Sequence, residues 1–86
     1  MQLDIIKKSG LYQKDELEQL LGVSRMSIYK YFIGRTEPRP ALQRRINRLA
    51  TIITAFTNKG ILPFTEDTES STRLTVVGKM LEILNK

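Results

Sequence analysis

Two short helical patterns meet at Gly22, Val23 and Ser24, and this junction constrains the fold more than any other feature of the chain. Glycine adopts a left-handed backbone at little cost, so Gly22 can end the helix that carries Leu17 and Leu21. The Ser24 hydroxyl can accept a hydrogen bond from an otherwise unpaired N–H group at the start of the next helix. Two short helices joined by a brief turn that contains glycine form a helix-turn-helix.

The helix after this turn, over residues 24–32, has an inward and an outward side. Three residues of the turn and this helix fall on the inward side: Val23, Ile28 and Tyr31. The outward side carries polar, basic and flexible side chains: Arg25, Met26, Ser27, Tyr29 and Lys30. A helix that presents such groups directly after a helix-turn-helix turn is suited to the major groove of DNA.

Positive charge is concentrated in one part of the chain. The 86 residues include 14 Lys or Arg and 9 Asp or Glu, which gives a net charge of +5. Residues 51–86 are neutral, whereas residues 25–48 carry seven basic residues and one acid, Glu37. A basic block that begins at the outward-facing helix is the electrostatic footprint of phosphate contact. The alternative is a solvated helix face, and the sequence leaves both interpretations open for Arg44, Arg45 and Arg48.

Other function classes are disfavoured by the composition. The chain has no Cys and no His, so it lacks thiolates and imidazoles for catalysis or metal binding. Its carboxylates lie at predicted helix ends and in loops, and we expect no enzyme activity, cofactor or metal. No apolar run approaches the about 20 residues needed to cross a bilayer, and the N-terminus lacks the order of a signal peptide. We therefore expect a soluble protein without a membrane partner or an evident small-molecule ligand.

The rest of the chain also has mainly helical patterns. We expect a short helix that ends at Ser9 and Gly10, and a second that starts near residue 13 or 14. Residues 35–39 are excluded from helix, because each proline disfavours helical geometry in the residue before it. Pro40 suits the first turn of a fourth helix. That helix carries one apolar stripe for the core: Leu42, Ile46, Leu49, Ile53 and Phe56.

The C-terminal segment permits two interpretations. From residue 73 onward, apolar residues form two adjacent helical stripes, a face broader than one small domain needs to cover. We therefore expect a homodimer through five residues of this segment: Leu74, Val77, Met80, Leu81 and Leu84. Residues 72–77 are also β-branched and partly alternating, so a short hairpin with residues 61–65 before the last helix is the alternative.

Residues 6–49 resemble the helix-turn-helix of the phage repressor and Cro family, also called the XRE family. The pattern of that family appears here as Leu17, Leu21, Gly22, Val23, Ser24, Ile28, Tyr31 and Gly34. One departure is Glu18, where the family usually has a small alanine. A glutamate there must be partly exposed or paired with a base such as Arg25 or Lys30.

A weaker resemblance points to the TetR-type repressors. Residues 22–25, followed by residues 28–32 with their Tyr-x-Tyr-Phe ending, are similar to the DNA-binding motif of that family. Residues 34–40 depart from its pattern, and the chain lacks the large ligand-binding domain that those proteins carry.

The helical patterns predict an all-α fold of about five helices, and the Cro-like resemblance implies a lambda-repressor-like arrangement. Residues 1–57 would be the DNA-binding part, and residues 58–86 a dimerisation segment packed on it. The resemblance implies base contacts from Arg25, Met26, Tyr29 and Lys30. Arg25 could pair with guanine and Met26 could contact a thymine methyl, although Met26 and Tyr29 could instead fill the seam between helices. It also implies phosphate contacts from Lys14, Ser27, Arg35, Thr36 and Arg39.

The expected function is sequence-specific binding of double-stranded DNA by a transcriptional regulator. We expect a homodimeric repressor of phage or mobile-element type that covers an operator with two half-sites. It would act in the cytoplasm of a bacterial cell or phage-infected host, associated with the nucleoid when bound. The alternative is an antitoxin or adaptor-type module that binds another protein through its C-terminal segment.

Overall fold

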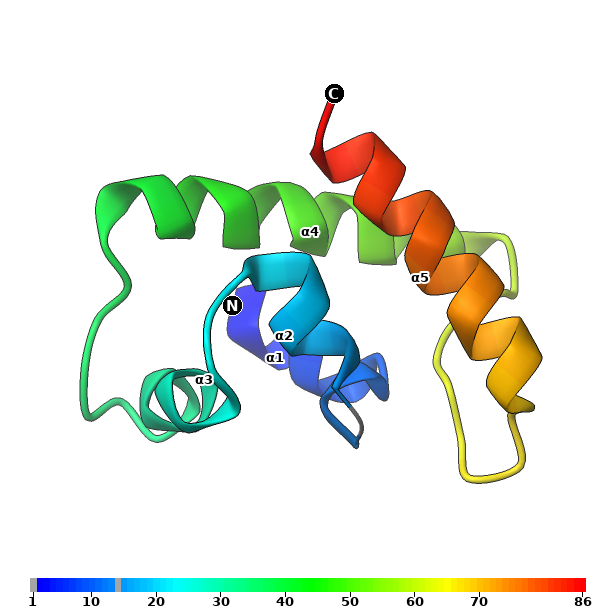
Figure 1. The fold of residues 1–86 in the computed structure, drawn as a ribbon, viewed down its shortest axis with the longest axis horizontal. Helices are drawn as coiled ribbons and strands as arrows, with labels where there is room; N and C mark the ends of the chain where they lie inside the picture. Colours follow the sequence, from blue (N-terminus) through cyan, green and yellow to red (C-terminus); the bar gives the residue numbers. More distant parts are fainter. Residues whose placement is uncertain (1, 14) are drawn as a thin grey trace.

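A computed structural model describes residues 2–13 and 15–86, which contain helices and no strand. In chain order the elements are α1 (Gln2–Lys8), the 3₁₀ helix η1 (Leu11–Gln13), α2 (Glu16–Leu21), α3 (Arg25–Phe32), α4 (Pro40–Asn58) and α5 (Ser70–Leu84). The predicted all-α class is confirmed. Figure 1 shows α4 lying across the molecule above α1 and α2, with α3 at one end and α5 crossing near the other.

The turn between α2 and α3 has the predicted local geometry. Gly22 is left-handed at φ 72°, and its N–H donates to the Glu18 carbonyl at 2.8 Å. Ser24 is extended, and its Oγ accepts a hydrogen bond from the Ser27 N–H at 3.2 Å. α2 begins at Glu16, later than predicted, and residues 11–13 form the separate helix η1.

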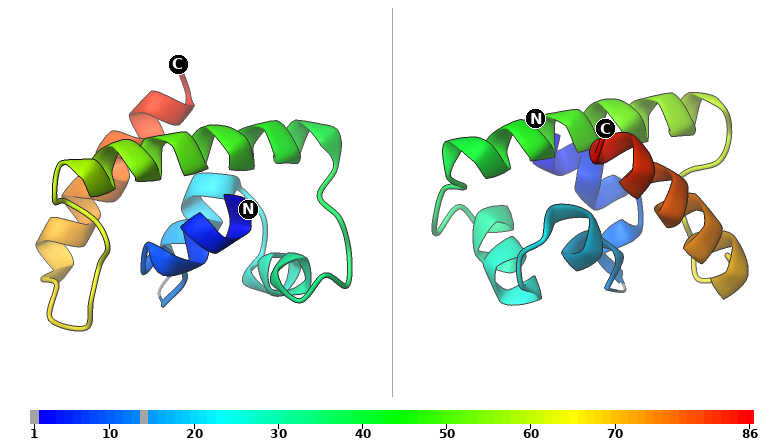
Figure 2. Two further views of the ribbon diagram at one scale, coloured as in Figure 1. Left: turned by 180° about the vertical axis from the view of Figure 1, so that it is seen from behind. Right: turned by 45° about the horizontal axis from the view of Figure 1, so that its top comes forward.

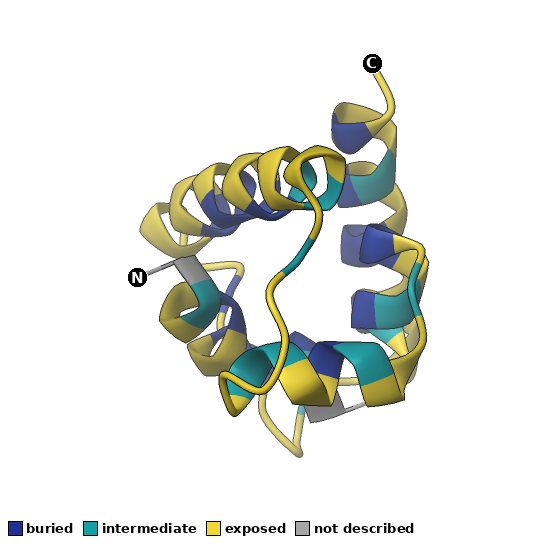
Figure 3. Ribbon diagram, turned by 90° about the vertical axis from the view of Figure 1, so that its left-hand side faces the viewer, coloured by how far each residue is buried: buried dark blue, intermediate teal, exposed yellow. Residues whose placement is uncertain are grey.

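The core lies where α4 meets the other helices. α1 packs along α4, and α5 packs against both α2 and α4. Leu42 of the predicted α4 stripe is half-buried and packs against the core. The other four residues of the stripe are buried: Ile46, Leu49, Ile53 and Phe56. In Figure 3 the buried sides of the helices face the interior. None of the described helices is long and apolar enough to cross a membrane.

The last helix decides between the two interpretations of the C-terminal segment in favour of helix, and it corrects the predicted dimer face. α5 begins at Ser70 and includes residues 72–77, so the alternative hairpin is not formed in the described chain. Val77, Met80 and Leu84 are only 3%, 0% and 2% exposed. They lie inside the core because α2 and α4 both cover α5.

The predicted dimer face is therefore wrong for Val77, Met80 and Leu84, which have no free surface for a partner. Leu74 is the exception, at 72% exposed, and Leu81 is half-buried. The apolar face of α5 is broad because it is shared between two helices of the same chain. One small domain does cover most of it.

A buried arginine joins the two ends of the chain. Arg73 on α5 is 3% exposed, and its Nε and Nη2 donate to the two carboxylate oxygens of Glu16 at 2.9 and 2.7 Å. Its Nη2 also donates to the Gly10 carbonyl at 3.0 Å, and its Cζ lies 4.7 Å from the centroid of the Phe64 ring. The hydrogen bond to Glu16 raises the pKa of Arg73 against the opposing effect of burial.

The loop after α4 packs closely on the corner between α1 and η1. Gly10 has φ 79°, and a Cβ atom added to it would lie 2.3 Å from the Phe64 carbonyl oxygen. The Phe64 N–H donates to the Ser9 carbonyl at 2.8 Å, which fixes this approach. Only glycine satisfies both the backbone angle and the contact at position 10.

Replacing Gly10 with Ala should lower the free energy of unfolding by clearly more than replacing Gly60 with Ala. Both glycines have positive φ, at 79° and 78°, so both variants carry left-handed strain of about 1–2 kcal/mol. A Cβ at Gly60 meets nothing within 4 Å, whereas at Gly10 it meets backbone atoms. Urea unfolding followed by circular dichroism measures both losses. Equal losses would show that the contact with Phe64 does not constrain the fold.

Candidate nucleic-acid interface

The outward side of α3 is open to solvent. Met26 is 63% exposed, and Tyr29 and Lys30 are exposed on the same side of the helix. The three residues predicted to face inward are buried or half-buried: Val23, Ile28 and Tyr31. α3 packs mainly against α2. It lies at the end of the molecule away from α5 in each view (Figures 1 and 2).

The N-terminus of α3 is held by a carboxylate from α2. The Oε1 atom of Glu18 accepts a hydrogen bond from the Arg25 backbone N–H at 2.9 Å, where the helix dipole favours negative charge. Glu18 is partly exposed, as expected, but it binds the backbone of Arg25 rather than a basic side chain. The hydroxyl of Ser27 accepts a hydrogen bond from the Ser24 hydroxyl at 3.1 Å, so Ser27 is engaged in the helix cap.

Arg25 is exposed, but its guanidinium group is not free. Its Nη2 donates to the Tyr12 carbonyl at 3.2 Å, and its Cζ lies 5.1 Å from the centroid of the Tyr12 ring. The Tyr12 ring in turn meets the Phe32 ring edge-on, with centroids 4.8 Å apart. Arg25 therefore bridges the first turn of α3 and the helix η1.

The connection from α3 to α4 carries the remaining predicted phosphate contacts. Arg35, Thr36 and Arg39 are exposed, and the side chains of the two arginines have no hydrogen bond or ion pair within the described part of the chain. This connection runs from α3 to the start of α4 at the same end of the molecule (Figure 1). Lys14, the last of the five predicted phosphate contacts, lies outside the described residues.

Arg45 has structural partners that the sequence did not indicate. Its Nε donates to the Leu20 carbonyl at 2.6 Å, near the C-terminus of α2. Its Nη2 donates to the Asn85 Oδ1 at 3.2 Å, just beyond α5. A cation at the C-terminus of a helix also interacts favourably with the helix dipole.

Arg48 makes a similar contact one turn further along α4. Its two terminal nitrogens donate to the carbonyls of Ile83 and Leu84, each at 3.0 Å. Arg44 is exposed and has no such partner among the described residues. The basic block therefore contains two kinds of arginine, and no pattern within the block separates them, because the bound carbonyls belong to distant segments.

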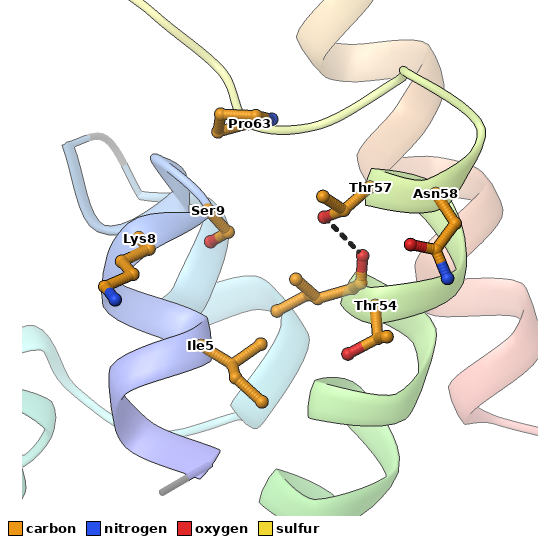
Figure 4. Close-up of a pocket in the computed structure, with 8 residues that line it drawn as sticks. Ile5, Lys8, Ser9, Thr54, Thr57, Asn58 and Pro63 are labelled. Carbon is orange, nitrogen blue, oxygen red and sulfur yellow. Dashed lines mark hydrogen bonds between the residues drawn. The ribbon is translucent and has the colours of Figure 1, made fainter.

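The surface also has hollows away from the exposed side of α3. One of about 570 Å³ lies between the end of α3 and the start of α4 and is lined in part by Tyr31 and Pro38. Another of about 270 Å³ lies between α1 and α4, with Pro63 at its edge (Figure 4). The hydroxyls of Thr54 and Thr57, which line it, already donate to helix carbonyls four residues earlier, at 2.9 and 2.7 Å.

Comparisons with protein-family models, with curated proteins and with solved structures found no match to this chain.

Replacing Arg48 with Met should destabilise the fold, whereas replacing Arg44 with Met should not. Methionine keeps the aliphatic stem but leaves the Ile83 and Leu84 carbonyls without charged donors, which should cost about 1 kcal/mol or more. A partner-free exposed arginine should change stability by less than about 0.5 kcal/mol. Chemical denaturation of the two variants provides the comparison. If Arg44→Met is as destabilising as Arg48→Met, the carbonyl contacts of Arg48 contribute nothing.

Proposed function

We propose that this protein is a sequence-specific regulator that inserts α3 into the major groove of double-stranded DNA. The observation that carries the proposal is the exposure of Met26, Tyr29 and Lys30 on one side of α3 while Ile28 is buried on the other. Residues three and four apart form one ridge on a helix. Side chains on such a ridge, soon after a glycine-containing turn, can reach the edges of several base pairs.

Exposed basic residues around α3 would hold the DNA backbone. Arg35 and Arg39 are unpaired within the described chain, and Arg44 follows them at the start of α4. Phosphate contacts position a protein on the duplex without reading its sequence. Glu37 is the only acid between residues 25 and 48, so little negative charge opposes this approach.

The resemblance to the phage repressor and Cro family supports the same proposal. Its pattern needs a helix end at Gly22 and a helix cap at Ser24, and both residues have the matching backbone geometry. In this proposal α2, the turn and α3 are a helix-turn-helix, and the five helices form a lambda-repressor-like DNA-binding domain. Repression would follow from occlusion of the operator, without catalysis.

A homodimer through the exposed side of α5 would complete such a regulator. Leu74 projects into solvent, and Leu81 lies two turns further along the same side. Gly78 lies between them with open space where a side chain would be, so a second helix can approach closely. A two-fold dimer would present two copies of α3 to half-sites about 34 Å apart.

The exposure of Leu74 also favours the second candidate function, a protein-interaction module of antitoxin or adaptor type. In that case the exposed side of α5 would bind a different protein. A shift of duplex DNA by the purified protein alone, weakened by salt, separates the DNA-binding regulator from this alternative.

Replacing Arg39 with Ala should weaken binding to all duplexes alike and reduce the slope of log affinity against log salt concentration by about 0.9. Replacing Tyr29 or Lys30 with Ala should instead change base preference, at a cost of about 1–3 kcal/mol on the preferred site. Fluorescence anisotropy with selected and random duplexes over a range of salt concentrations measures both effects.

Lys59→Ala is the matched control, because it removes one positive charge from the opposite end of α4. It should leave the salt slope unchanged. The proposed interface is wrong if the Arg39 and Lys59 variants behave alike, or if the wild-type protein binds no duplex at low salt.

Replacing Leu74 with Lys should give a folded monomer with much weaker binding to a two-half-site operator. The side chain is 72% exposed, so the fold itself should tolerate the charge. Ile83→Lys is the control, since Ile83 is 38% exposed on the opposite side of α5 and should leave the dimer intact. Sedimentation equilibrium at micromolar concentration reports the assembly. A monomeric wild-type protein would exclude the homodimer and leave this surface to another partner.

A further inference from the structure

Four residues of α3 were predicted to contact bases. Of these, Arg25 is the one whose side chain is held by another described segment, the helix η1. Its guanidinium donates to the Tyr12 carbonyl at 3.2 Å and lies over the Tyr12 ring, with Cζ 5.1 Å from the centroid. Its backbone N–H is bound by the Glu18 carboxylate at 2.9 Å. The residue is exposed, yet both its backbone and the end of its side chain are fixed from outside α3.

The Tyr12 ring is itself well supported. Tyr12 is half-buried and packs against the core, and its ring meets Phe32 at an interplanar angle of 63°. An edge-to-face aromatic pair favours a defined ring orientation. A ring held in this way gives the guanidinium of Arg25 a fixed surface for a cation–π contact.

A held arginine has an advantage in reading a base. An unrestrained arginine side chain loses rotamer freedom when it binds, which weakens the complex. The guanidinium has five N–H donors, and the Tyr12 carbonyl accepts from one of them. Donors remain to bind guanine O6 and N7, the pair of acceptors that arginine reads in the major groove.

We propose that Tyr12 is a specificity-determining positioning residue that holds the Arg25 guanidinium ready to read a guanine at the start of α3. This inference rests on the proposed insertion of α3 into the major groove. Tyr12 acts through Arg25 and makes no base contact of its own.

The first test replaces the ring. Tyr12→Leu removes the aromatic surface and keeps the backbone carbonyl, and Tyr12→Phe keeps the ring. Tyr12→Leu should weaken binding to the preferred duplex by about two- to tenfold and lower the preference for guanine at one position. Tyr12→Phe should restore both. The salt slope should stay unchanged in both variants, because no phosphate contact is lost.

Tyr31→Leu is the matched control, since Tyr31 is another half-buried tyrosine and, unlike Tyr12, makes no hydrogen bond or cation–π contact with Arg25. Any loss of affinity in this variant should be equal for all sequences. Tighter binding by Tyr12→Leu would overturn the proposal, because it would mean that Tyr12 holds Arg25 away from DNA. Loss of affinity without loss of the guanine preference would also overturn it.

A double-mutant cycle tests the coupling of the two residues. Once Arg25 has been replaced with Ala, Tyr12→Leu should cause no further change at that base position, so the two effects should be strongly non-additive. Additive effects would contradict the proposal. If Arg25→Ala leaves all base preferences intact in a protein that still binds DNA, the role of Tyr12 is excluded while α3 can still read bases through Tyr29 and Lys30. Failure of the wild type to bind any duplex removes both proposals.

A second variant covers the case in which Tyr12→Leu does not fold. Arg25→Lys keeps the positive charge but replaces the planar, rigid fork of donors with a flexible ammonium that has no flat face to lie over the ring. It should lose the guanine preference and keep the salt slope. If Arg25→Lys keeps the guanine preference, a planar group held by Tyr12 is not needed to read this base. The proposal would then be wrong.

Discussion

The buried ion pair between Arg73 and Glu16 is the contact on which the arrangement of this small fold depends. Removing one partner of such a pair typically costs about 3–5 kcal/mol, because an uncompensated charge is left inside the protein. The same guanidinium binds the Gly10 carbonyl and lies over the Phe64 ring. α5, the loop before it, the corner after α1 and the start of α2 thus meet at one side chain. Since α2 leads directly into the turn and α3, this contact also sets where α3 lies relative to α5.

Besides Arg25, which Tyr12 holds, arginine has three different roles in this chain, and net charge alone does not separate them. Arg73 is buried in an ion pair, whereas Arg45 and Arg48 bind carbonyls at or near the C-termini of α2 and α5. Exposed arginines such as Arg39 have no partner in the described chain. Only this last kind can bind phosphates without giving up an internal contact. The proposed interface is therefore smaller than the basic block suggests, and it is concentrated at the α3 end of the molecule.

Much of the fold follows from local chemistry, and the sequence predicts that part well. Gly22 ends one helix and Ser24 begins the next because each acts on backbone groups within a few residues. The inward side of α3 and the core stripe of α4 follow from helical periodicity. Pro40 marks the start of α4 because its fixed backbone angle suits a first helical turn. These features need no knowledge of distant segments.

By itself, then, the sequence determined the helix ends at Gly22, Ser24 and Pro40 and the exposed ridge of α3. The tertiary structure alone decided which apolar face is covered by other helices. It also decided which basic side chains are bound to groups within the chain. Val77 and Met80 were predicted to face a partner chain but are buried by α2 and α4. The contacts of Arg48 with α5 and of Arg25 with Tyr12 join residues 35 and 13 positions apart. Such partners become neighbours only when the chain packs, and periodicity within one segment carries no information about the surface that will cover it.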